Sequence, residues 1–163
     1  MPAILGLWLA WQRGDLPAAR EEVQRLLACA ADLDMARRGP GEDLRALALI
    51  GLAIGEAWTA QEEAERHFGQ SIALARRLGR PYLEVDGLAN WAMVAWERST
   101  RQAVELSMQA IELARRHGWT EEPVTTPAYV VLGVSSLSQG RLEQAKWTAL
   151  SVPFGLRCNR PKG

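Results

Sequence analysis

The residues of this sequence that could do chemistry are two histidines, two cysteines and three acidic pairs. His67 and His117 would bind a metal ion only if the fold brought them together with carboxylates. They occupy different offsets in two similar stretches, so we interpret them as surface or packing histidines. Cys29 and Cys158 form no Cys-x-x-Cys and have no activating histidines nearby, so we interpret them as free thiols in a reducing compartment.

The acidic pairs are explained by helix starts, where negative charge is favourable. These pairs are Glu42-Asp43, Glu62-Glu63 and Glu121-Glu122. Acid–base catalysis needs two carboxylates that face each other in a dry pocket. Neither Lys146 nor Lys162 lies in a glycine-rich phosphate loop. We therefore expect no catalytic residue, no metal site and no cofactor.

A repeat positions these side chains. The stretch from Ala64 to Gly79 matches the stretch from Ala103 to Gly118 at eight of sixteen offsets. Weaker copies open with Gly-x-Leu-x-x-Ala near both ends of the chain. The anchoring alanines are spaced 45, 39 and 42 residues apart: Ala19, Ala64, Ala103 and Ala145. A period near forty residues predicts a repeat array in which successive helix pairs stack on one another.

Each copy is predicted to contain two antiparallel helices. The first helices are Ile4–Gln12, Asp43–Trp58, Tyr82–Glu97 and Ala128–Gln139, and the second are Leu16–Asp32, Ala60–Leu78, Thr100–His117 and Leu142–Leu150. Thr59 with Glu62, and Ser99 with Gln102, fit the capping box. We expect an all-α solenoid of about four antiparallel helix pairs over residues 1–150, with repeats at about 1–41, 42–79, 80–118 and 119–150.

The ends of the helices and of the chain carry further signals. Gly79 and Gly118 stand where a left-handed residue would end a helix. The last segment, 151–163, has no helical periodicity and contains two prolines and two glycines. We expect this tail to be irregular and disordered.

The bulk composition excludes some partners. Nineteen basic and nineteen acidic residues give no net charge, which argues against direct nucleic-acid contact or a polybasic membrane surface. The apolar segment 4–11 is too short to span a membrane and lacks the positive flank of a signal peptide. We expect a cytoplasmic protein that does not contact membranes.

The helix pairs resemble tetratricopeptide repeats, best at Gly14 to Ala19, Gly140 to Ala145 and Leu132-Gly133. Two departures are the turn leucine missing from Thr59 to Ala64 and Arg98 in place of a turn glycine. In that family the first helices line a concave surface. The resemblance implies a groove whose apolar and polar members are Trp8, Trp11, Ile50, Ile54, Asp86, Ala89, Asn90, Met93, Trp96, Val130, Val134 and Leu137. Either this groove is open to a ligand or a docked helix, or tight winding and neighbouring repeats bury it.

The phrases Trp58 to His67, Ala75 to Tyr82 and Ala110 to Trp119 resemble the repeat region of large bacterial LuxR-type regulators of the maltose-regulator kind. That resemblance implies a middle segment that senses an inducer and contacts partners, between a nucleotide-hydrolysing module and a helix-turn-helix. Neither flanking module is recognisable in these residues.

Three hypotheses follow from the sequence. The first is a non-catalytic sensing and interaction scaffold that forms part of a larger transcriptional regulator. The second is a free-standing tetratricopeptide adaptor that binds a peptide or partner helix. The third is a small enzyme, which no constellation of residues motivates. The partners we expect are a protein, a peptide or a small-molecule inducer, and the apolar ends favour self-association.

Overall fold

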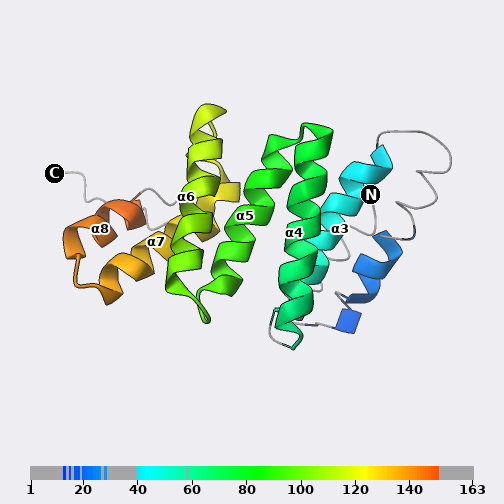
Figure 1. Ribbon diagram of the computed structural model, residues 1–163, viewed down its shortest axis with the longest axis horizontal. Helices are drawn as coiled ribbons and strands as arrows, with labels where there is room; N and C mark the ends of the chain where they lie inside the picture. The colour runs from blue at the N-terminus through cyan, green and yellow to red at the C-terminus, as the bar shows by residue number, and fades with distance from the viewer. Residues whose placement is uncertain are drawn as a thin grey trace. The chain divides into compact units, whose positions relative to one another are not determined.

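In the computed structural model of the chain, residues 40–57 and 59–150 are described, together with residues 13, 15, 17–18, 20–26 and 28. Every regular element in this described part is helical (Figure 1). The expected all-α class is therefore confirmed. The elements are α3 (Pro40–Glu56), α4 (Gln61–Leu78), α5 (Pro81–Ala95), α6 (Thr100–Arg116), the 3₁₀ helix η1 (Pro123–Thr125), α7 (Thr126–Ser138) and α8 (Leu142–Leu150).

The six α-helices α3 to α8 begin and end within three residues of the predicted bounds. The predicted helix Ile4–Gln12 and the tail 151–163 lie outside the described residues. The chain divides into two compact units, Met1–Gly87 and Leu88–Gly163, with the division inside α5. The solenoid of four pairs and its repeat boundaries therefore stay predictions, and each unit is described by itself.

The predicted hydroxyl cap is confirmed at one helix and wrong at another. Ser99 is the N-cap of α6, and its Oγ accepts a hydrogen bond from the backbone N–H of Gln102 at 3.2 Å. At α4 the N-cap is Ala60, which makes no side-chain cap bond. Thr59 stands one residue too early, so its hydroxyl does not cap the helix.

Glycine ends two of the helices, as predicted, and begins the turn after a third. Gly79 and Gly118 have φ values of 64° and 74°, and Gly140 has the same left-handed backbone at 70°. After Gly79, the backbone N–H of Arg80 donates to the carbonyl of Ala75 at 2.9 Å. This bond satisfies a carbonyl that the helix end would leave unpaired. The chain therefore reverses direction with very few connecting residues.

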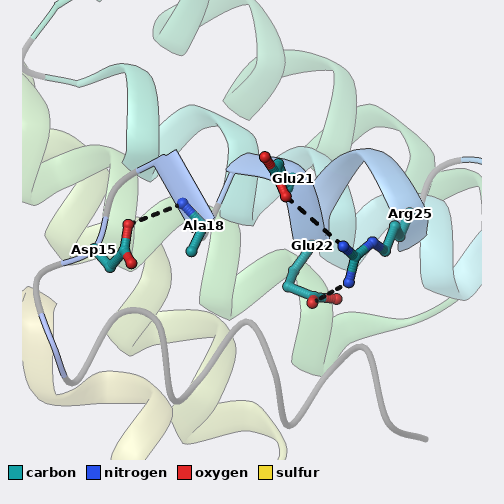
Figure 2. A network of polar contacts seen from close by, with 5 residues as sticks. All are labelled: Asp15, Ala18, Glu21, Glu22 and Arg25. Carbon is teal, nitrogen blue, oxygen red and sulfur yellow. Dashed lines mark hydrogen bonds and ion pairs between the residues drawn. The ribbon is translucent and has the colours of Figure 1, made fainter.

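The N-terminal helical stretch begins at an aspartate cap. The backbone N–H of Ala18 donates to Oδ1 of Asp15 at 3.0 Å, and Arg25 pairs with Glu21 and Glu22 one turn earlier (Figure 2). An aspartate oxygen that accepts from the third helical residue is a favourable N-cap. The capped stretch thus explains why helix forms after residue 15.

The first unit packs three helical layers in chain order. Val23 and Leu26 of the N-terminal stretch form one buried cluster with Ala48 and Leu52 of α3. Helices α3 and α4 then contact each other along their length. A second buried cluster joins them: Ala46, Leu49 and Leu74, with the partly buried Leu78 of α4 and Leu83 of α5 packed against it.

A buried hydroxyl and several exposed ion pairs add to this packing. The Oγ of Ser71, in α4, donates to the carbonyl of Ala46, in α3, at 2.9 Å. At the start of α3, Glu42 pairs with Arg77 at 2.8 Å and Asp43 with Arg80 at 3.0 Å. This acidic pair therefore faces arginines rather than another carboxylate, as expected of a helix start.

In the second unit, α7 lies between α6 and α8 and contacts both. Small residues permit these contacts: Ala103, Ala110, Ala114 and Ala128 are fully buried. A Cβ built on Gly133 of α7 would lie 3.7 Å from Cγ2 of Thr148 in α8. The backbone of α7 therefore approaches α8 closely at the Leu132-Gly133 motif.

Two glycines in helices should respond oppositely to alanine. A Cβ at Gly69 meets nothing within 4 Å, whereas a Cβ at Gly87 would lie 2.8 Å from Cγ1 of Ile72. We expect Gly69→Ala to raise the free energy of unfolding by about 1 kcal/mol through helix propensity. Gly87→Ala should lower it by about 1–3 kcal/mol through overpacking. Urea unfolding followed by circular dichroism measures both, and changes of the same sign would contradict the packing described here.

The caps provide a second matched pair. Ser99→Ala should lower the free energy of unfolding by about 1 kcal/mol, because an amide of α6 loses its acceptor. Thr59→Ala should change it by less than about 0.5 kcal/mol, because Thr59 is exposed and caps nothing. Thermal and urea unfolding of the two variants would show the difference, and equal losses would mean that Thr59 caps α4 after all.

Candidate functional site

An apolar hollow lies between the end of α5 and the middle of α7, and we call it the α5–α7 hollow. It has a volume of about 80 Å³ and is lined by Met93, Trp96, Val130, Val131 and Val134. Val131 is buried at its floor, whereas Met93 and Val134 are 45% and 43% exposed. Large apolar side chains thus stay open to solvent around a shallow depression.

Helical periodicity places these residues on one face. Val130, Val134 and Leu137 follow each other at offsets of four and three residues, which lie above one another on a helix. Leu137 is 55% exposed and extends the apolar surface beyond the α5–α7 hollow. Helix α7 carries no charged side chain, and neither do residues 88–95 of α5. The surface is therefore apolar and uncharged along α7 and along the second half of α5.

The structure brings together four of the residues predicted to line a groove: Met93, Trp96, Val130 and Val134. Asn90 is half-buried in the same unit and does not line the α5–α7 hollow. Ala89, another predicted member, is fully buried.

The remaining predicted groove residues belong to the first unit. Ile54 and Asp86 are half-buried there. Ile50 is only 4% exposed and packs in the interior, so its side chain offers no surface to a ligand. Trp8 and Trp11 lie outside the described residues. A continuous groove along the whole chain stays a prediction.

A larger pocket in the first unit was not predicted from the sequence. It has a volume of about 290 Å³ and lies between the N-terminal helical stretch and the end of α3. Its lining is Pro17, Arg20, Val23, Gly51, Leu52, Gly55, Glu56 and Thr59. We call it the α3 pocket. The one feature of the sequence that could have indicated this pocket is the spacing of Gly51 and Gly55. They lie four residues apart on the same face of α3, and neither has a side chain.

A histidine–carboxylate pair at the edge of this pocket was also missed. Nδ1 of His67 lies 2.6 Å from Oε2 of Glu56, and their side chains are 15% and 13% exposed. A carboxylate can only accept, so Nδ1 donates. The pair joins the last residue of α3 to the second turn of α4. His117, by contrast, stacks on Trp119 with ring centres 4.6 Å apart.

A scan against protein-family models, a search of curated proteins and a search of solved structures each found no match to this chain. No helix in the described part is both long and apolar enough to cross a membrane. Among the described residues, no three His, Cys, Asp or Glu side chains gather as metal ligands would. Cys29 and Cys158 lie outside these residues. The α5–α7 hollow and the α3 pocket are therefore the features of the described residues that bear on function.

One ionisable group on α7 has a shifted pKa. Tyr129 is half-buried, and this burial raises the pKa of its phenol above the ordinary value, with a further contribution from the negative charge of Glu121. Both effects disfavour the tyrosinate anion. Tyr129 therefore stays neutral across the physiological range and adds no charge to α7.

A titration tests this environment. In a Tyr82→Phe protein, Tyr129 is the only tyrosine, and its tyrosinate absorbance should have a midpoint above about 10. Glu121→Gln should lower that midpoint while burial keeps it raised. The unfolded chain ionises first, so the free energy of unfolding should fall as pH rises from about 10 to the folded-state pKa. A midpoint at or below the ordinary value would show that Tyr129 is fully solvated.

Proposed function

We propose that this chain is a non-catalytic binding scaffold that docks an apolar helical segment of a partner protein in the α5–α7 hollow. The observation that carries the proposal is the exposure of Met93, Val130 and Val134 on an uncharged surface. Contiguous exposed apolar side chains are characteristic of interaction sites. Covering them contributes about 25 cal/mol for each Å² of apolar area removed from water.

The absence of charge defines the face that the partner must present. A charged side chain docked against α7 would lose its hydration, and α7 offers no opposite charge to compensate it. An apolar side chain meets no such penalty. The matching partner is therefore an amphipathic helix with apolar anchors at helical spacing, laid in the hollow with its polar face outward.

The same lining argues against an enzyme at this site. Acid–base catalysis needs a titratable side chain within hydrogen-bond reach of the substrate. The residues that line the α5–α7 hollow are methionine, tryptophan and valine, none of which transfers protons. Binding is the activity that this chemistry supports.

The biological setting is proposed from the resemblance to LuxR-type regulators. In that setting the scaffold contacts partners and senses an inducer within a larger transcriptional regulator in the cytoplasm. The alternative setting is a free-standing adaptor that uses the same hollow. Sequencing the DNA around the source gene separates the two, because a regulator requires an adjoining nucleotide-hydrolysing module and a helix-turn-helix in the same reading frame.

Peptide selection tests the docking proposal directly. A phage library of helical peptides would be selected on the purified chain, and the recovered peptides synthesised and measured by fluorescence anisotropy. We expect peptides with apolar residues at helical spacing and micromolar affinity. Val134→Glu should weaken them by at least about tenfold, or roughly 1.4 kcal/mol, because it places a charge in the hollow.

Met108→Glu is the matched control. Met108 is 60% exposed on α6 and lies outside the lining of the α5–α7 hollow, so its substitution should leave peptide affinity unchanged. Circular dichroism would confirm that both variants keep their helical content. Failure to select any peptide, or equal losses in the two variants, would overturn the proposal.

A further inference from the structure

The α3 pocket differs in chemistry from the α5–α7 hollow, and we propose that it binds a free aliphatic α-amino acid of about the size of leucine. Its volume of about 290 Å³ lies just below the range of ligand pockets, about 300–1,000 Å³. This size suits a small metabolite. Among its described lining residues are one cation, one carboxylate and an aliphatic wall.

The cation is Arg20. Arg25, one and a half turns further along, is already paired with Glu21 and Glu22 (Figure 2). Among the described residues, Arg20 has no ion-pair partner, and it is exposed at the pocket. A guanidinium presents paired donors that match the two oxygens of a carboxylate. Arg20 therefore provides the contact for the carboxylate of the ligand.

The carboxylate is Glu56. Its Oε2 accepts from Nδ1 of His67 at 2.6 Å, which holds the side chain at the pocket edge with 13% of it exposed. Its Oε1 accepts no hydrogen bond from a described residue. An ammonium group donates three hydrogen bonds and has the opposite charge. Glu56 therefore provides the contact for the amine, and the exposed hydroxyl of Thr59 lies on the same pocket wall.

The aliphatic wall is formed by Pro17, Val23 and Leu52, with α3 bare at Gly51 and Gly55. Val23 is fully buried, and a Cβ built on Gly55 would meet nothing within 4 Å. The space that a side chain would fill at Gly55 is thus open to a ligand. A branched aliphatic side chain of the ligand placed there would exchange water for an apolar lining.

Simpler ligands match only part of this lining. A hydrocarbon would cover Arg20 and Glu56 without pairing them, which costs their hydration. A monocarboxylate would pair with Arg20 but would be repelled by the negative charge of Glu56. An amine would pair with Glu56 but would be repelled by the positive charge of Arg20. A zwitterion with an aliphatic side chain satisfies both charges and the apolar wall together.

Isothermal titration calorimetry of the full chain with three probes tests the proposal. The probes are L-leucine, 4-methylpentanoate, which lacks the amine, and 3-methylbutylamine, which lacks the carboxylate. We expect L-leucine to bind with a dissociation constant below about 1 mM. Each analogue should bind at least about tenfold more weakly. Arg20→Gln should reduce the affinity for L-leucine to about that for the amine, because the carboxylate loses its partner.

Two glycine variants locate the binding. Gly55→Leu fills the α3 pocket and should abolish L-leucine binding, whereas Gly69→Leu, on α4 and also facing open space, should leave it unchanged. Circular dichroism confirms that both variants fold. The absence of L-leucine binding, equal binding of the analogues, or retained binding in Gly55→Leu would each overturn the proposal. These results are independent of the peptide experiment, which reports on Val134.

Discussion

Close approach of helices through residues with little or no side chain is the constraint on which this structure depends. Half of the buried apolar residues in the described part of the chain are alanines. An alanine buries little surface, so the free energy of folding depends on many close contacts between backbones rather than on a few large side chains. The close approach is evident at two glycines: Gly87 lies against Ile72, and Gly133 lies against Thr148. At Gly55 a helix position without a side chain has no neighbouring atoms to contact, and the α3 pocket lies there.

Local features of the fold could be predicted from the sequence, because they depend on neighbouring residues. Helix bounds followed from apolar periodicity and from glycines at the turns, and the left-handed backbone at Gly79 and Gly118 was predicted correctly. The cap at Thr59 was wrong because capping depends on the exact residue at which a helix begins, and sequence patterns leave that start uncertain by a residue or more. Met93, Trp96 and Val134 were predicted from the repeat register, and they do gather at one depression.

The α3 pocket and the pair between Glu56 and His67 could not be predicted in the same way. Both arise where separate helices meet, and the pocket depends on side chains that are missing rather than present. A single sequence does not reveal which bare helix face will remain uncovered. The prediction for Ile50 was wrong in the opposite way: it holds a plausible groove position, but it is buried in the first unit, where its side chain lies near Gly87.

The glycine turns after α4 and α7 also determine where the chain can accommodate added sequence. At Gly79 and at Gly140 the next helix begins within three residues of the left-handed glycine. An insertion in either turn would therefore separate helices that now pack directly. The connection from Gly118 to η1 is longer and carries the exposed Glu121 and Glu122. Surface connections of this kind tolerate inserted domains. A reporter domain or affinity tag placed between Glu121 and Glu122 would therefore leave the helix contacts intact.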